Sequence, residues 1–330
     1  MSASSPQALS SQGAAPPPLG GGAAPLGGSL APVPVKAIPV RHWGQWVGAA
    51  VVVYLLVAFV LSLARNPNIE WDIIGDYLFK DLTLRGVWVT LYLTVVSMAI
   101  GIVGGTLLAV MRLSDNPVLS SIAYGYIWFF RGTPVLVQIL VWAYLGALYP
   151  ELVLGIPIFG PVFASAETNA VIGATAAGIL GLGLNEAAYA AELVRAGIIS
   201  VDKGQQEAAL SLGMGGGQTM WSIILPQAMR VIIPPMGNET ISMLKTSALV
   251  SVIAGHDLLT NLQKAYAQNF RIMELLLVAC IWYLFLTTLL SIGQHYLEAY
   301  FSRGFGAQQA DRAQRRAFKR AQRRGESGAV

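Results

Sequence analysis

Three long runs without a charged residue constrain this sequence more than any other feature. They are Val47–Ala64, Gly86–Met111 and Leu275–Gln294, with 18, 26 and 20 residues. About 20 apolar residues suffice for an α-helix to cross the hydrocarbon core of a bilayer. Soluble domains carry about 25% charged residues, whereas this chain is 12% charged and 55% hydrophobic. The sequence therefore predicts an all-α, polytopic membrane protein.

Three further spans are predicted from apolar segments that polar or charged residues interrupt. They are Leu119–Phe130 with Gly132–Pro150, Thr168–Asn185 and Val231–Gly255. The first is long or broken at Arg131, the second continues as a helix towards Ile198, and the third is kinked near Pro234 and Pro235. About six transmembrane helices are therefore expected, and an even number places both termini on one side of the membrane.

The distribution of basic residues predicts which side that is. If both termini are cytosolic, the cytosolic segments hold fourteen basic residues and the external segments five, while Arg131 and Lys245 lie within spans. Cytosolic loops usually carry the excess of Lys and Arg. Both termini are therefore predicted to be cytosolic in a multi-pass protein of the cell membrane, although the C-terminal tail supplies eight of the fourteen.

Composition divides the chain into four parts. Residues 1–40 are rich in Pro, Gly, Ala and Ser and are predicted to be a disordered tail. Residues 41–77 hold an extra N-terminal transmembrane helix and an external loop, and residues 78–300 hold the main membrane domain. Residues 301–330 form a basic tail, predicted to be cytosolic. With only two aromatic residues from Arg303 onward, this tail is more typical of attraction to an anionic inner leaflet than of nucleic-acid binding.

The polar, glycine-containing segment Gln206–Pro226 lies between two apolar blocks and, in this orientation, in the cytosol. A short helix that opens with Glu207, Ala208 and Ala209 is expected to begin it. Its narrow face, suited to insertion into a cleft of another protein, consists of Ala208, Ala209 and Leu212. A carboxylate in the first turn of that helix would stabilise the helix dipole. Gly213 is expected to break the helix. A second helix, Met220–Leu225, is expected to end at Pro226.

This segment resembles the EAA signature of permease subunits from ATP-binding cassette (ABC) importers. The residues that match at the spacing of the signature are Glu207, Ala208, Ala209, Gly213, Ile223, Leu225 and Pro226. Three flanking motifs are similar to those of polar amino-acid importers: Phe129–Pro134, Tyr189–Arg195 and Gly237–Thr246. The resemblance covers about residues 78–300. One departure is Gly215–Gly217, a turn richer in glycine than the signature requires, which would make the loop softer.

The resemblance implies a five-helix permease core that forms the translocation pathway for polar amino acids, with the EAA segment as a coupling-helix loop. It implies four kinds of partner: cytosolic ABC ATPase subunits, a second permease subunit (identical or homologous), an external solute-binding protein and an amino-acid substrate. ATP and magnesium would bind the ATPase subunits, so this chain would hold no cofactor. Leu212 would join the signature residues in ATPase coupling.

Polar residues on one face of the span Val231–Gly255 are candidates for contacting the solute. A spacing of 100° per residue places five of them within an arc of about 120°: Asn238, Glu239, Ser242, Lys245 and Thr246. An amino acid offers an ammonium and a carboxylate, which Glu239 and Lys245 would complement. Alternatively, these two charges brace the interface between subunits.

Arg131 is a second candidate, because a charged group at membrane depth is costly and usually functional. It would pair with Glu186 or Glu192 as a structural brace, or bind the carboxylate of the solute through two hydrogen bonds. Glu192 and Arg195 are spaced as a local pair on one helix.

Enzyme motifs and metal sites are not evident. The chain contains no GxxxxGK[ST] sequence and no Gly-Lys pair at all, so it carries no phosphate-binding P-loop. Its three histidines, His42, His256 and His295, lack the spacing of metal ligands. The alternative function is an amino-acid transporter driven by an ion gradient, which usually shows an internal repeat. A membrane scaffold without transport would need no polar face on a span.

Overall fold

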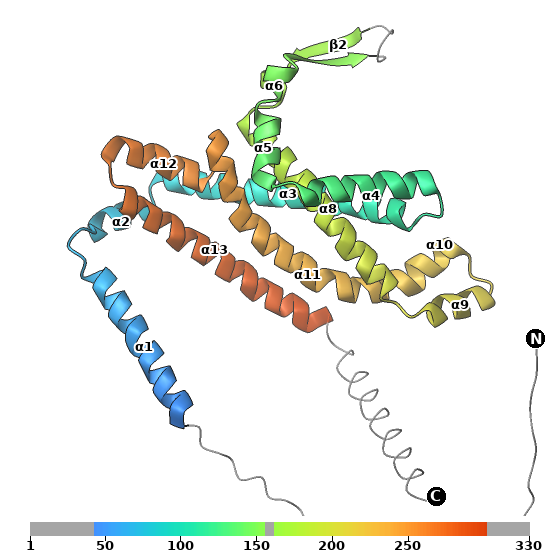
Figure 1. Cartoon of the computed structure of the whole chain (residues 1–330), viewed down its shortest axis with the longest axis horizontal. Helices are drawn as coiled ribbons and strands as arrows, with labels where there is room; N and C mark the ends of the chain where they lie inside the picture. The colour runs from blue at the N-terminus through green and yellow to red at the C-terminus, as the bar shows by residue number, and fades with distance from the viewer. Residues whose placement is uncertain (1–42, 156–161, 302–330) are drawn as a thin grey trace, which may run out of the picture. The chain divides into compact units, whose positions relative to one another are not determined.

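Helices make up almost all of the structure, a computed structural model that describes residues 43–155 and 162–301 (Figure 1). The all-α class predicted from the sequence is confirmed. The predicted tails, residues 1–40 and 301–330, lie outside the described residues apart from Phe301.

The elements follow in this order. The N-terminal part comprises α1 (Trp43–Ala64), α2 (Trp71–Leu78), α3 (Asp81–Leu113), α4 (Pro117–Gly132), α5 (Val135–Ala143), α6 (Leu145–Leu148), β1 (Glu151–Gly155) and β2 (Val162–Glu167). The C-terminal part comprises α7 (Thr168–Val171), α8 (Ala174–Ile199), α9 (Lys203–Ser211), α10 (Gly216–Thr219), the π-helical turn η1 (Met220–Ile224), α11 (Leu225–Thr246), the 3-10 helix η2 (Ser247–Ile253), α12 (Leu258–Asn269) and α13 (Ile272–Phe301).

Three of the described helices are long and apolar enough to cross a membrane alone: α1, α3 and α13. The pair α4–α5 becomes a fourth if its two helices count as one span. The helices α8 and α11 have 26 and 22 residues but are less apolar, because polar residues such as Glu186 and Glu239 lie within them. The expected number of six spans therefore stays a prediction.

The chain divides into two compact units between Asn66 and Pro67. The helix α1 belongs to the first unit, and none of its residues is buried. The second unit begins ahead of residue 78, where the membrane domain was expected to start, and it includes α2. Trp282 of α13 connects α13 to the end of α2, because its Nε1 donates a hydrogen bond to the carbonyl oxygen of Leu78, at 2.9 Å.

Within the second unit, α3 and α8 pack along each other through small residues. Gly101 of α3 lies against Glu186 of α8. One turn along, a Cβ on Gly105 would lie 2.8 Å from the backbone nitrogen of Ala191, closer than real Cβ atoms come. Small residues allow helices inside membranes to approach this closely. The tight packing fixes where Glu186 lies.

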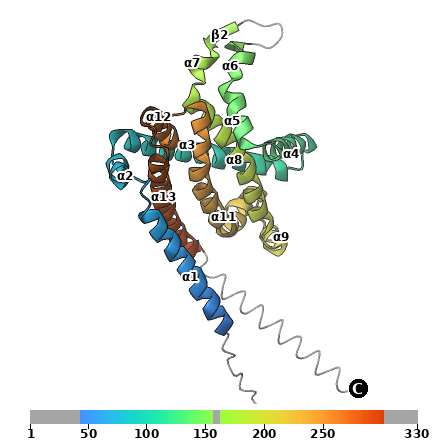
Figure 2. The same cartoon turned by 60° about the vertical axis from the view of Figure 1, so that its left-hand side comes forward.

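The segment around Arg131, expected to form one long or broken span, bends by 99° between α4 and α5. The helix α4 ends at Gly132 because Pro134 has no backbone N–H and disfavours helical geometry in the residue before it. In both views, α6 and the β-hairpin project beyond the other helices of the unit (Figure 1, Figure 2). The helix α5, which leads to them, packs on α8, where its fully buried Ile139 lies against Gly181. We call residues 135–155 and 162–167 the arm.

Side chains bind the backbone carbonyl groups that the bend releases. Gln138 Nε2 donates to the carbonyl oxygens of Phe130 and Thr133, at 3.0 and 3.1 Å. Asn185 Nδ2, from α8, also donates to the carbonyl oxygen of Phe130, at 3.0 Å. These bonds tie the bend to α8, so the break is a built feature of the fold.

The arm ends in a two-stranded antiparallel hairpin that the sequence did not predict. The strands β1 and β2 pair from Glu151 opposite Glu167 to Gly155 opposite Val162. Every residue of β2 is exposed. Without a buried face the strands show no alternation of apolar and polar residues, the signal by which a strand is recognised.

The segment Val231–Gly255, predicted as one span, consists of two elements. The helix α11 continues through Pro234 and Pro235 to Thr246, and η2 follows it. Gln294 of α13 supports the proline region, because its Nε2 donates to the carbonyl oxygen of Pro234 at 2.8 Å.

The segment that resembles the EAA signature forms two short helices around a glycine turn, with two corrections. The turn is confirmed, since Gly213 has a φ of 79°. The helix α9, however, begins at Lys203, after Asp202, whose side chain accepts a hydrogen bond from the backbone of Gly204 at 2.8 Å. Glu207 therefore lies outside the first turn, and the stabilisation of the helix dipole expected from it is wrong.

The second correction concerns Pro226, which does not end a helix. It lies in the first turn of α11, where the missing N–H of proline would have no partner in the helix anyway. The π-helical turn η1 runs directly into α11. The coupling loop, which we define as residues 203–226, is therefore continuous with the helix that carries the predicted pathway residues.

Candidate functional site

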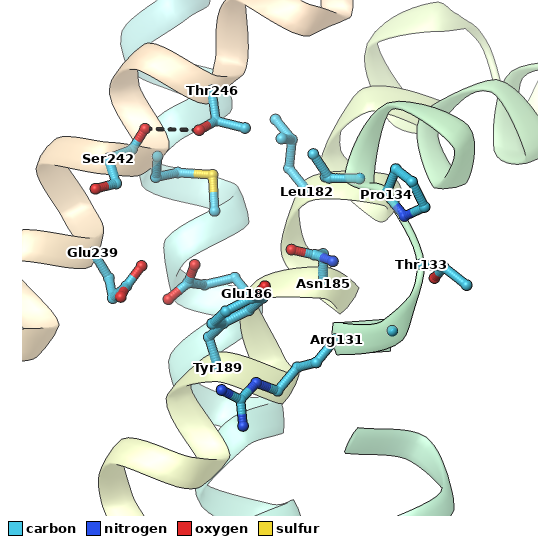
Figure 3. A pocket seen from close by; sticks show the side chains of 13 residues that line it. Arg131, Thr133, Pro134, Leu182, Asn185, Glu186, Tyr189, Glu239, Ser242 and Thr246 are labelled. Carbon is cyan, nitrogen blue, oxygen red and sulfur yellow. Dashed lines mark hydrogen bonds between the residues drawn. The ribbon is translucent and has the colours of Figure 1, made fainter. Parts of the chain in front are cut away.

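A cavity of about 490 Å³ lies where α4, α5, α8 and α11 meet (Figure 3). Its walls come from residues far apart in the sequence: Arg131–Val135, Leu182, Asn185, Glu186, Tyr189, Glu239, Ser242, Met243 and Thr246. The hydroxyl of Thr246 donates its hydrogen to the backbone oxygen of Ser242, with an oxygen–oxygen distance of 2.9 Å. The lining residues show that charged and polar groups face a space in an otherwise apolar helical unit.

Two glutamates turn their carboxylates towards each other in the cavity, Glu186 from α8 and Glu239 from α11 (Figure 3). Glu186 is only 5% exposed, and its Oε1 has no hydrogen-bond partner among the described residues. Neither glutamate takes part in any ion pair of the described part of the chain. A buried carboxylate without a partner is costly, so this wall suits a cation that arrives from outside the chain.

Arg131, at the end of α4, also lines the cavity. Its guanidinium carbon is 5.1 Å from the centre of the Tyr189 ring, a cation–π contact. It forms none of the ion pairs found among the described residues. Glu192 instead binds Arg195, with 2.7 Å between Oε2 and Nη2, so their prediction as a local pair is confirmed. The hydrogen-bond donors of Arg131 remain available to a ligand.

The beginning of α5 also borders the cavity. Pro134 precedes the helix, which has no side-chain cap, and Pro134 and Val135 both line the cavity. The first N–H groups of a helix have no partner within it and carry a partial positive charge. The lining of the cavity thus offers both negative and positive groups to a ligand.

The structure brings together four of the six predicted pathway residues: Arg131, Glu239, Ser242 and Thr246. Asn238 and Lys245 are exposed on α11 and do not line the cavity. Sequence analysis did not place Asn185, Glu186 or Tyr189 in the pathway. A signal existed for Glu186, since it is the one charged residue between positions 168 and 191.

The predicted coupling residues lie mostly on the surface of the coupling loop. Glu207, Ala208, Gly213 and Pro226 are exposed, and Leu212 is 83% exposed, whereas Ile223 and Leu225 are half-buried. Ala209 is buried, so it contributes to the packing of the loop and not to its exposed surface.

A helical membrane domain with a polar cavity beside a broken helix defines the class of membrane transport proteins. Residues 101–303 match the family described as binding-protein-dependent transport system inner membrane component. The chain is 45% identical over 273 residues to the arginine transport system permease protein ArgU of Corynebacterium glutamicum, covering 82% of this chain and 84% of that protein. The chain therefore belongs to this family of inner-membrane transport components.

Other relatives and solved structures agree with this assignment. The L-cystine transport system permease protein TcyB of Bacillus subtilis is 33% identical, over 72% of this chain and 93% of that protein. An amino acid ABC transporter crystallised with histidines is 34% identical, with a TM-score of 0.59 over 70% of this chain and 99% of that chain. The methionine ABC transporter MetNI, inward-facing, is 20% identical with a TM-score of 0.51 and shares the fold. These relatives favour an ABC permease over the transporter driven by an ion gradient.

Proposed function

We propose that this chain forms the membrane pathway of an ABC importer for amino acids, and that the cavity holds the amino acid on its way through. The single observation that supports this most is the pairing of two carboxylates with Arg131 around one space. A free amino acid carries an ammonium and a carboxylate, and an arginine carries a further cation. The relative ArgU bears arginine transport in its name, which agrees with an acidic wall.

The proposed binding mode assigns each wall to one end of the solute. Glu186 and Glu239 bind its cationic group, because hydrogen bonds between ionised groups are stronger than those between neutral groups. Arg131 and the uncapped start of α5 bind its carboxylate, as broken helices do in other transporters. Ser242 and Thr246 add polar contacts, whereas Asn238 and Lys245 extend the polar face of α11 beyond the cavity or brace the subunit interface.

The coupling loop is proposed to dock onto cytosolic ABC ATPase subunits, which bind ATP and magnesium, so the chain itself is not an enzyme. This assignment places both termini in the cytosol. A second permease subunit would complete the pathway, and an external binding protein would deliver the solute. Nucleotide can shift the equilibrium between the two conformations of the permease only if it stabilises one of them more than the other. The continuity of the loop with α11 would carry that preference to Glu239.

Uptake in proteoliposomes tests the cavity. The complex is reconstituted with its ATPase subunits and binding protein, and radiolabelled arginine is the probe. We expect Glu239→Gln to lower uptake and solute-stimulated ATP hydrolysis by about tenfold or more, since a lost charged hydrogen bond is worth about 1.5–3 kcal/mol. The control is Glu151→Gln on the exposed hairpin, which should change neither. Unchanged uptake in Glu239→Gln would rule out the pathway role of this residue.

A further inference from the structure

The helices α11 and α13 pack along each other (Figure 1, Figure 2), and their contact changes character along its length. Towards the C-terminal end of α11 the contact is apolar, since Leu244 and Leu286 belong to one buried cluster. Beyond Leu286, the only buried residue among those described on α13 is Gln294, which is 8% exposed. In this half of the contact, the most deeply buried side chain of α13 is therefore polar.

Gln294 lies where α11 is weakest. Pro234 and Pro235 lack the N–H groups that would bond the carbonyl groups four residues earlier, so α11 loses two of its internal hydrogen bonds here. Prolines inside a helix are common points of bending. Gln294 Nε2 donates to the carbonyl oxygen of Pro234 and to Oε1 of Glu298 on its own helix, both at 2.8 Å. These two bonds hold the amide between the two helices.

Gly237 allows the glutamine to come this close. A Cβ added to Gly237 would overlap the amide oxygen of Gln294. Gly237 and Leu244 are seven residues apart, which places both on the face of α11 that packs on α13. Glu239 lies two residues from Gly237, about 200° around the helix, and lines the cavity. The contact with α13 therefore supports α11 from behind Glu239.

We propose that Gln294 is a positioning residue for transport. It holds α11 against α13 at the proline pair, and it thereby keeps Glu239 directed into the cavity when the coupling loop moves the other end of α11. The proposal rests on the proposed function, in which Glu239 binds the cationic group of the solute. Gln294 does not line the cavity, so it acts on the solute only through α11.

Paired substitutions test the contact in the complex reconstituted with its ATPase subunits and binding protein. Gly237→Ala should lower arginine uptake by about tenfold or more, because the new methyl group pushes α11 away from α13. Adding Gln294→Ala should raise uptake at least about threefold above that of Gly237→Ala, since the shorter side chain vacates the space, whereas independent losses would multiply. The matched control is Gly293→Ala, where nothing lies within 4 Å of an added Cβ and uptake should not change. A double variant no faster than Gly237→Ala would overturn the proposal.

Gln294→Met separates a positioning role from a purely structural one. Methionine has about the length of glutamine but cannot donate the hydrogen bond to Pro234. Arginine uptake should fall by about three- to tenfold, while the yield of the complex and its ATP hydrolysis without solute stay unchanged. In a Glu239→Gln background the same substitution should have no further effect on uptake, because the group that Gln294 positions is already lost.

The outcomes distinguish this proposal from the proposed function. A parallel fall of yield, ATP hydrolysis and uptake in Gln294→Met would make the residue structural only. Full uptake in Gln294→Met, or an equal further loss in the Glu239→Gln background, would also refute the positioning role. Each of these results leaves the proposed cavity intact. Unchanged uptake in Glu239→Gln alone would instead refute the proposed role of Glu239 in the cavity, and the positioning role with it.

Discussion

The coupling loop and the cavity are built in opposite ways. The loop is one contiguous stretch, residues 203–226, which exposes the apolar side chains of Leu212 and Trp221 and whose charged residues are Lys203 and Glu207. The cavity is assembled from four helices, and its charged residues are Arg131, Glu186 and Glu239. The loop would therefore be recognised mainly by its shape, and the cavity would bind its ligand mainly through charge.

This difference teaches where each region is vulnerable. A docking surface built around a backbone turn fails when its shape changes, and it tolerates the loss of single contacts. A cavity that binds a charged solute fails when one charge is neutralised, even if its shape is kept. A single substitution should therefore directly impair either ATPase coupling or solute binding, and seldom both.

The largest effect is expected from Gly213→Asp in the coupling loop. Gly213 has a φ of 79°, and nothing lies within 4 Å of a Cβ added there, so the new side chain would project towards the partner. A left-handed residue with a Cβ costs about 1–2 kcal/mol, and the charge must also be desolvated on docking. We expect loss of ATPase co-purification and of arginine uptake, measured after mild-detergent extraction.

The matched control for that substitution is Gly215→Asp, which adds the same charge two residues away. Gly215 has a φ of −69° and is the N-cap of α10, where Asp is a favoured residue. The ATPase should therefore remain bound. Equal loss in both variants would mean that charge, rather than the glycine turn, decides docking.

The next largest effect is expected from Glu186→Gln in the cavity. The amide has the shape of the carboxylate but cannot attract a cation, so arginine uptake should fall by about 10- to 100-fold. ATPase co-purification should not change. The control is Glu274→Gln, because Glu274 is as buried as Glu186, at 4% against 5% exposed, but lies on α13 away from the cavity. Full uptake in Glu186→Gln would show that this carboxylate is structural.

The contrast between the two regions also explains what the sequence could predict. The turn at Gly213 was predicted because its residues are neighbours in the chain and the requirement for glycine is local. The errors at Glu207 and Pro226 are errors of helix boundaries. The sequence alone did not show that Asp202 caps α9, or that a π-helical turn lets the chain run through Pro226 into α11.

Apart from Arg131, which stood out as a charge at membrane depth, the residues of the cavity were predicted only where one helix contributes several of them. The spacing along α11 brought out Glu239, Ser242 and Thr246, because a helical period can be read from a single stretch. Asn185 and Tyr189 join them only through the packing of α8, which depends on close contacts such as that at Gly105. Contacts between distant segments leave no periodic signal in one sequence.

A smaller effect is expected from Lys245→Ala. Lys245 is exposed and does not line the cavity, and substitutions at such positions usually change free energies by less than about 0.5 kcal/mol, or about twofold in a rate. Arginine uptake should therefore fall by no more than about twofold, and Asn238→Ala should behave alike. A tenfold loss in either variant would extend the solute path along the exposed face of α11.

The smallest effect is expected from Gly217→Ala, which tests whether the glycine-rich part of the coupling loop is needed. Gly217 lies within α10, and nothing lies within 4 Å of a Cβ added there, so alanine fits without strain. Replacing glycine at a compatible position typically stabilises a fold by about 0.4–1 kcal/mol, because the unfolded chain loses freedom. Arginine uptake and ATPase binding should stay at the level of the unaltered chain while the midpoint of thermal unfolding rises slightly. If uptake fell while ATPase binding persisted, the softness of this turn, and not only its shape, would be part of how the loop transmits movement.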